Sequence, residues 1–146
     1  MHDGKIEIYT DGSCLGNPGF GGWGAIILFT GEEIHLSGGE EKTTNNRMEM
    51  MAVIKALEWM HNDSGLSDGD LYSQKIIIYS DSNLLIQSLN QGWKRKANKD
   101  LWESIERLRA WLDISWTWVK GHDSNKYNNL VDKLAVKAAE KFKKKR

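Results

Sequence analysis

A short run of consecutive apolar residues in the middle of the chain constrains the fold more than any other feature. The run covers residues 75–79 and reads Lys-Ile-Ile-Ile-Tyr. Such a continuous run is typical of a strand that is buried on both faces, as in a sheet covered by helices. The chain is therefore expected to adopt an α/β fold in which helices pack against the sheet.

Three more strands are expected before this run. Residues 5–13 alternate between two faces, which places Asp11 on the same face as Glu7 and Tyr9. A loop dense in turn residues follows at 14–19. The next two strands are expected at residues 22–29 and 33–39, with a turn at 30–32 between them. Together the three strands form an antiparallel meander.

Helical segments surround the remaining strands. Thr43 or Thr44 can cap a helix that runs to about Trp59 or Met60. Further helices are expected at residues 82–91, 100–112 and 126–142, with a last strand at 114–119 and an exposed loop at 61–73. This order predicts a five-stranded mixed sheet, in which the three-strand antiparallel meander is joined by parallel strands and helices cover both faces. Ligands of such folds bind near strand ends.

Composition narrows the class of protein. The chain has 146 residues, of which 40% are hydrophobic and 27% charged, enough for one folded domain and unlike a disordered chain. It has no run of about 18 apolar residues and no apolar stretch at its start, so neither a membrane span nor a signal peptide is expected. A single cysteine, Cys14, suits a reducing compartment. We therefore expect a cytoplasmic monomer that needs no membrane and no obligate protein partner.

The formal net charge is zero, but the charges are segregated. Residues 93–99 carry four positive charges and no acid, and residues 133–146 carry seven positive charges against Glu140 alone. The rest of the chain is correspondingly acidic. This distribution is compatible with a basic face for a polyanion and an acidic centre elsewhere. A lysine-rich terminal helix can also be simply a solvated end.

Four acidic residues occupy positions where packing favours apolar side chains. Glu49 shares a helical stripe with four apolar residues, and Asp132 shares one with three. Asp11 lies near the end of the first strand, and Asp81 follows the buried run. A carboxylate that stays charged, buried and unpaired costs several kcal/mol.

Each acid alone has an ordinary explanation. Asp11 could be a turn residue, Glu49 could interact with its helix dipole, Asp81 could cap the next helix, and Asp132 could pair with a lysine. One divalent-metal site explains all four together, because Mg²⁺ prefers carboxylate oxygens. Two such ions, about 3.5–4 Å apart, can clamp a phosphodiester. The scattered histidines and the single cysteine do not favour zinc.

Five ordered motifs of the chain resemble the type 1 ribonuclease H family. They are residues 9–19 (YTDGSCLGNPG), 21–25 (GGWGA), 43–52 (TTNNRMEMMA), 79–83 (YSDSN), and 118–122 (WVKGH) followed by 132–135 (DKLA). They extend over nearly the whole chain. The resemblance implies the ribonuclease H-like fold and a single catalytic domain over residues 1–146, without a separate hybrid-binding domain.

The resemblance also implies an activity. Family members cleave the RNA strand of RNA–DNA hybrids by a two-metal-ion mechanism that leaves 5′-phosphate and 3′-hydroxyl ends, with Mg²⁺ or Mn²⁺ as cofactor. Asp11, Glu49, Asp81 and Asp132 match the four catalytic acids that hold the metals. His122 matches a mobile histidine implicated in proton transfer or product departure, although a histidine here could also be an ordinary loop residue.

Substrate contacts are implied in the same way. Asn17, Asn46 and Asn83 match positions that contact the hybrid, and Cys14 and Asn45 match nearby positions that contact its backbone. Amides suit this task because they donate and accept hydrogen bonds, as 2′-hydroxyls do. The alternatives are a turn-forming role for Asn17 and a helix-capping role for Asn45 or Asn46.

The connector after the third predicted helix combines charge with an aromatic ring. Trp93, Lys94 and Lys96 are therefore candidate hybrid contacts, although Trp93 could instead pack beneath the loop. This connector is shorter than the basic extension of several bacterial members, and the basic C-terminal end could compensate through phosphate contacts. Asn129 stands where many members have glutamate. The rival interpretations are a DNA nuclease or transposase core on the same scaffold and a non-catalytic nucleic-acid-binding module.

Overall fold

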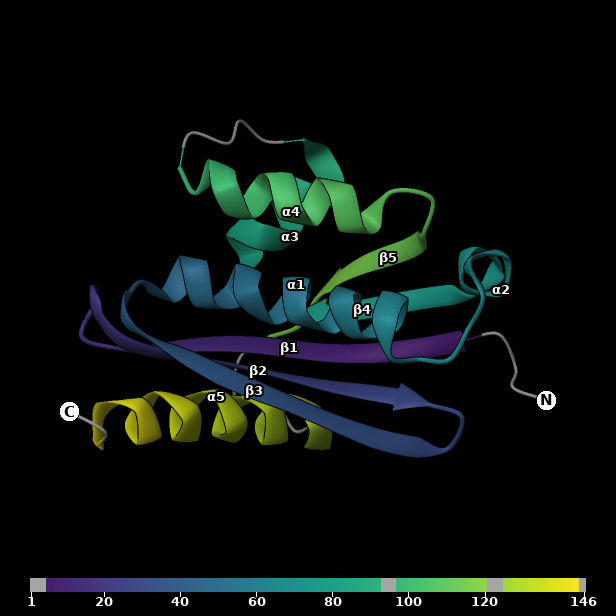
Figure 1. Ribbon diagram of the computed structural model, residues 1–146. Coiled ribbons are helices and arrows are strands. Elements are labelled where there is room, and N and C mark those ends of the chain that lie inside the picture. Colours follow the sequence, from purple (N-terminus) through teal and green to yellow (C-terminus); the bar gives the residue numbers. More distant parts are fainter. Residues whose placement is uncertain (1–4, 93–96, 121–124, 145–146) are drawn as a thin grey trace.

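The computed structural model describes residues 5–92, 97–120 and 125–144. Its elements, in chain order, are β1 (Lys5–Leu15), β2 (Gly19–Phe29), β3 (Glu32–Thr43), α1 (Asn45–Asn62), α2 (Asp68–Ser73), β4 (Lys75–Ser80), α3 (Asn83–Gln91), α4 (Lys99–Arg109), β5 (Asp113–Trp118) and α5 (Lys126–Lys144) (Figure 1). Within the described residues, none of these helices has the length and apolar character needed to cross a membrane.

The five strands form one mixed sheet in the order β3-β2-β1-β4-β5. β1, β2 and β3 pair antiparallel, whereas β4 pairs parallel with both β1 and β5. This topology confirms the predicted meander with added parallel strands. The β1–β4 pairing reaches only the pair Tyr9 and Tyr79, while β1 continues beside β2 as far as Leu15. The β1–β4 pairing therefore ends in the middle of β1, close to the end of β4. In open α/β sheets, ligands bind outside such strand ends.

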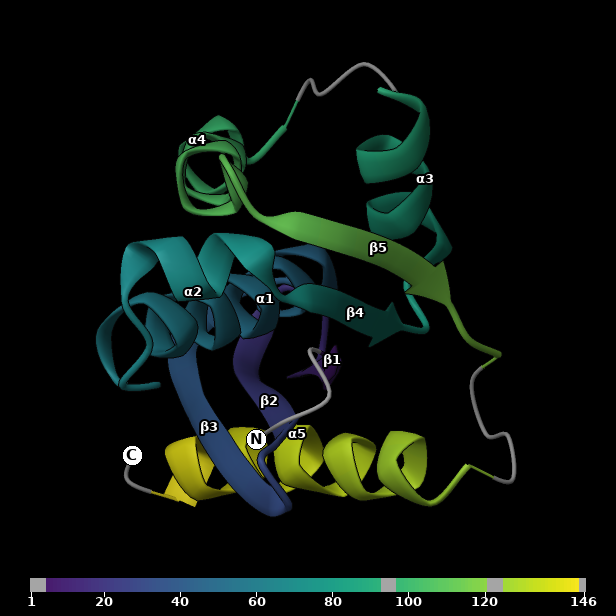
Figure 2. The ribbon, with the colours of Figure 1, turned by 90° about the vertical axis from the view of Figure 1, so that its right-hand side faces the viewer.

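Helices cover both faces of the sheet, as predicted. α1 packs on β1 and β2 from one side, with α4 against it, and α5 lies along the other side (Figures 1 and 2). The main core lies between the sheet and α1, and its fully buried members include Ile6, Ile8, Ile78, Leu57 and Ile105. A separate small cluster of Trp23, Met48 and Ala52 packs the first turns of α1 against β2.

The expectation that the apolar run is buried on both faces is wrong for one of the two faces. Ile76 and Ile78 are buried, but Ile77 and Tyr79, on the opposite face, are partly exposed. The reason is that α5 packs on β1, β2 and β3. Stacking on Tyr9, with ring centroids 4.5 Å apart, gives Tyr79 part of its cover instead.

Two local predictions also need correction. The segment 61–73 is not only a loop, because it contains the short helix α2, in which Ser67 accepts a hydrogen bond from the Asp70 amide (3.2 Å) and Leu71 is buried. With one buried side chain in six residues, α2 has no hydrophobic periodicity from which a helix could be predicted. The helix expected at 100–112 ends at Arg109, and Trp111 beyond it has a φ of 72°.

Candidate active site

The predicted acids converge where β1 and β4 part. Asp11 lies in the middle of β1, and Asp81 directly follows β4. Glu49 lies near the start of α1, on one face of the sheet, and Asp132 lies in α5 on the other. Four elements that are distant in sequence thus contribute one carboxylate each.

Three of these acids form a compact cluster. One carboxylate oxygen from each of Asp11, Glu49 and Asp81 lies within 4.8 Å of the others. The fourth acid, Asp132, lies close enough to Asp11 for its side chain to raise the pKa of Asp11. The structure therefore brings together all four acids that the sequence singled out.

Burial and mutual repulsion make the site electrostatically unusual. Asp11 is only 4% exposed. Burial first, and then the charge of Asp81, raises the pKa of Asp11 from 3.8 to about 9, although the Gly12 amide donates a hydrogen bond to its Oδ1 (2.9 Å). Burial and the charges of Asp11 and Asp81 likewise raise the pKa of Glu49 well above its ordinary value.

This cluster has the chemistry of a site for divalent cations. Within the described part of the chain, the Oε2 atom of Glu49 is buried without a hydrogen-bond partner. Carboxylates held this close would repel one another when ionised, and a hard cation removes that repulsion while it accepts their oxygens as ligands. The donor set, made of oxygens alone, fits Mg²⁺ or Mn²⁺ better than zinc.

The structure rejects the ordinary explanations for two of the acids. Asp11 lies within a strand and not in a turn. The cap of α3 is Ser82, whose Oγ accepts a hydrogen bond from the Leu85 amide (3.2 Å), so Asp81 is not the cap. The backbone carbonyl of Asp81 accepts a hydrogen bond from the indole Nε1 of Trp118 (3.2 Å), which ties this loop to the end of β5.

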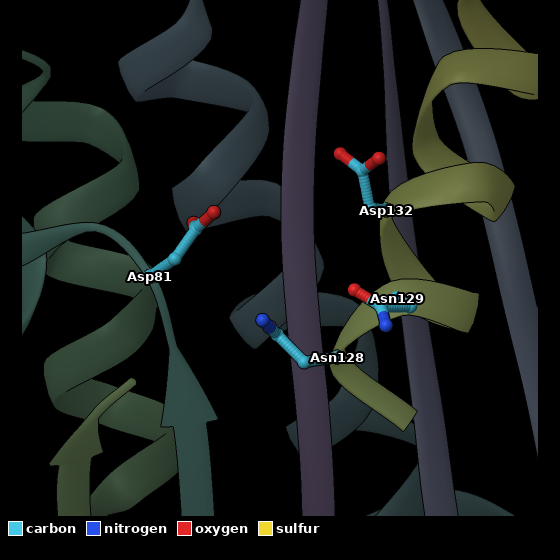
Figure 3. A pocket seen from close by; sticks show the side chains of 4 residues that line it. All are labelled: Asp81, Asn128, Asn129 and Asp132. Atoms are coloured by element: carbon cyan, nitrogen blue, oxygen red, sulfur yellow. The ribbon is translucent and has the colours of Figure 1, made fainter. Parts of the chain in front are cut away.

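Asp132 also faces a small polar pocket. The pocket is lined by Asp81, Asn128, Asn129 and Asp132, and Figure 3 shows Asp81 on one side and the three residues of α5 on the other. The sequence interpretation did not include Asn128 among the site residues, although it lies four residues before Asp132 on the same helical face. It is buried, and its Nδ2 donates a hydrogen bond to the carbonyl of Lys120 (3.3 Å).

The candidate substrate contacts lie around the start of α1 and of α3. The Oδ1 of Asn17 accepts a hydrogen bond from the Asn45 amide (3.1 Å), so the β1–β2 loop lies against the start of α1. Asn45 and Asn46 are exposed, and neither caps the helix, because Thr44 does. Asn83 is exposed at the first position of α3.

Of the remaining candidate substrate and catalytic residues, the structure describes only Cys14. Cys14 is partly buried, and its single thiol hydrogen can be donated to the carbonyl of Gly16 (Sγ to oxygen 2.9 Å) or of Thr43 (3.4 Å). Four candidates lie outside the described residues, namely His122, Trp93, Lys94 and Lys96.

Comparison with known proteins gives a consistent result. The family model described as RNase H matches residues 3–140. The chain is 41% identical over 150 aligned positions to the ribonuclease H of Chromobacterium violaceum, covering 93% of this chain and 95% of that one. It is 42% identical to the ribonuclease H of Francisella philomiragia, covering 92% and 90% of the two chains.

A solved structure agrees with these relatives. The fold is similar to that of LC11-RNase H1 in complex with an RNA/DNA hybrid, with a TM-score of 0.75, 26% identity and coverage of 93% of this chain and 97% of that one. Sequence, fold and the clustered acids thus lead to one assignment. The chain belongs to the ribonuclease H family.

Proposed function

We propose that this chain is an endonuclease that hydrolyses the RNA strand of RNA–DNA hybrids with the help of two divalent metal ions. The observation that carries the proposal is the cluster of Asp11, Glu49 and Asp81, with ligand atoms within 4.8 Å of one another, in a member of the ribonuclease H family. The similarity to LC11-RNase H1, which was solved with an RNA/DNA hybrid, supports the substrate.

Each acid has a distinct place in this proposal. Asp11 lies at the centre, since it is close to Glu49 and Asp81 and its pKa is raised by the neighbouring side chain of Asp132. Asp11, Glu49 and Asp81 would hold the metal ions, which we propose are Mg²⁺ with Mn²⁺ as a substitute, and Asp132 would complete and orient the site. When bound, such ions activate water and stabilise the charge that develops on the phosphate during in-line displacement.

The chain's own residues would prepare and finish the reaction. Cation binding would favour the ionised forms of Asp11 and Glu49, because a nearby positive charge lowers the pKa values that burial raises. His122 would assist proton movement, and departure of the 3′-oxygen would leave products with 5′-phosphate and 3′-hydroxyl ends.

Substrate contacts would come from exposed polar groups around the acids. Asn17, Asn45, Asn46 and Asn83 would contact the hybrid near the cleaved bond, where 2′-hydroxyls can both donate and accept hydrogen bonds. Cys14 would lie near the nucleic-acid backbone, and the connector residues Trp93, Lys94 and Lys96 would contact the hybrid farther out. We further propose that residues 1–146 act as one catalytic domain and as a monomer, in the cytoplasm or another reducing compartment.

The direct test is cleavage of end-labelled substrates while Mg²⁺ is raised from zero. We expect cutting of the RNA strand in an RNA–DNA hybrid, and none of double-stranded RNA or double-stranded DNA. Asp81→Asn should lower the rate by at least about 10³-fold without unfolding the protein, because it removes a carboxylate ligand. Asp113→Asn, exposed on β5, is the matched control and should cleave normally.

Two outcomes would contradict the proposal. Preferred cutting of double-stranded DNA would favour a DNA nuclease on the same scaffold. Hybrid binding without any cleavage stimulated by Mg²⁺, or near-normal turnover by the folded Asp81→Asn protein, would favour a binding module without this catalytic site.

A further inference from the structure

We propose that Gly12 and Gly24 are positioning residues of the metal site. They have no side chains, and this lets α1 and α5 approach the β1–β2 hairpin closely enough to carry Glu49 and Asp132 to Asp11. This inference rests on the proposed function, since it concerns the same four acids, and it adds two residues that bear no ligand atoms.

Gly12 and Gly24 are needed because there is no room for a Cβ atom, and not because of their backbone conformation. The glycines with positive φ are Gly16, Gly31, Gly65 and Gly92 among the described residues. Gly12 and Gly24 lie inside β1 and β2 with ordinary strand conformations, where any residue would satisfy the backbone. In strands glycine otherwise weakens the sheet, so a close approach of another backbone is the physical reason to have it here.

Gly12 determines how near α1 lies to β1. It follows Asp11 and faces α1, and a Cβ atom built on it would lie 2.4 Å from the backbone nitrogen of Glu49 and 2.5 Å from the carbonyl carbon of Met48. These are backbone atoms of the helix, so no side-chain rotation can relieve the contact. Ordinary contact begins at 3.4 Å, so α1 would have to retreat by about 1 Å at the residue that carries the ligand.

Gly24 has the corresponding place on the other face. It pairs with Asp11 across β1 and β2 and therefore faces α5 on the same side as Asp11. A Cβ atom there would lie 2.9 Å from the Cβ of Leu134 and 3.2 Å from the carbonyl oxygen of Val131. These two residues flank Asp132 in α5. The shift required, about 0.5 Å, is smaller than at Gly12.

These displacements are large compared with what a metal site tolerates. Productive site geometry must be kept to within roughly 0.5 Å, and a misplacement of about 1 Å can cost about 100-fold. Gly12→Ala should therefore weaken Mg²⁺ binding and lower the rate of cleavage by about 100-fold, whereas Gly24→Ala should lower both by about 3- to 10-fold.

The test is a double-mutant cycle with a readout that does not depend on catalysis. The apparent affinity for Mg²⁺ alone would be measured by NMR titration of the wild type, Gly12→Ala, Glu49→Gln and the double variant. If Gly12 acts through Glu49, the loss caused by Gly12→Ala disappears in the Glu49→Gln background. A second cycle of the same design combines Gly24→Ala with Asp132→Asn.

A control variant, Gly39→Ala, distinguishes a specific effect on the position of the acids from the general effect of a steric clash. In Gly39→Ala the new Cβ would lie 2.6 Å from the carbonyl oxygen of Gly21 and 3.2 Å from the ring of Phe142, at the far end of α5. It should reduce stability and leave the Mg²⁺ affinity of the folded protein unchanged. If Gly12→Ala does not fold, the milder Gly24→Ala cycle decides the question.

Additive losses in both cycles, or an equal loss of Mg²⁺ affinity in Gly39→Ala, would overturn the positioning role. Failure of the proposed function looks different, because Glu49→Gln and Asp132→Asn would then leave Mg²⁺ binding unchanged by themselves.

Discussion

Replacement of Asp11 by asparagine is expected to stabilise the metal-free protein while it abolishes activity. Asp11 is 4% exposed and lies beside three other acids. Its pKa of about 9 means that the folded protein keeps a proton on this carboxyl group at neutral pH, whereas the unfolded chain, with a pKa of 3.8, releases it. Ionisation of Asp11 therefore stabilises the unfolded state only, and it lowers the free energy of unfolding.

The size of the effect follows from linkage. Because the pKa is higher in the folded state, the folded state binds more protons between the two values, and the free energy of unfolding falls as the pH rises from 3.8 towards 9. The slope is about 1.4 kcal/mol per pH unit for one group. At pH 7 the loss is on the order of 4 kcal/mol, and at pH 5.5 it is about 2 kcal/mol.

Asparagine removes this loss and keeps the local hydrogen bonds. Its Oδ1 can accept from the Gly12 amide as Asp11 does (2.9 Å), and its amide group can donate to Asp132. The measurement is urea unfolding followed by circular dichroism in EDTA at both pH values. Asp11→Asn should be more stable than the wild type at each pH, with the larger difference at pH 7.

The reasoning is refuted if Asp11→Asn is no more stable than the wild type in EDTA, or if the gain does not depend on pH. Asp113→Asn serves as the control. Because Asp113 is exposed on β5, its substitution should change the free energy of unfolding by no more than about 0.5 kcal/mol. Addition of Mg²⁺ should then stabilise the wild type and the control, but not Asp11→Asn.

Three further substitutions probe other parts of the structure. Trp118→Phe removes the indole donor to the Asp81 carbonyl (3.2 Å) and should slow hybrid cleavage by about 3- to 10-fold in a folded protein, measured as kcat at saturating Mg²⁺. Tyr79→Phe removes the hydroxyl that donates to Glu7 (2.8 Å) and should lower the free energy of unfolding by about 1 kcal/mol in urea, with kcat unchanged. Ile8→Ala, at a fully buried core position, should lower it by about 3 kcal/mol, and a loss below about 1 kcal/mol would contradict the assigned core.

Much of the fold could be predicted because it follows short-range patterns. Alternation along residues 5–13 predicted which side chains of β1 face each layer, and the helical period placed Glu49 among buried residues of α1. The degree of burial of individual side chains was harder to predict from the sequence. Ile77 belongs to an apolar run but is partly exposed, because the position of α5 depends on packing across the whole sheet.

The candidate site was predicted unevenly for a similar reason. The acids were visible because a carboxylate in an apolar stripe conflicts with its surroundings. Asn128 was not recognised, since a buried amide becomes informative only when its neighbours are known, here Lys120 and the pocket beside Asp132. The caps were also ambiguous, because Ser82 and Asp81 are both good capping residues and local geometry decided between them.

By itself, the sequence determined the order of the strands and of the longer helices, the presence of four misplaced acids and the family to which the chain belongs. These properties depend on residue type and periodicity, which are local. Tertiary structure alone decided that β1 and β4 part beside Asp11, that Glu49 and Asp132 reach it from opposite faces, and that its pKa rises. These depend on distances and on exclusion of water, which exist only when segments far apart in the chain are packed together.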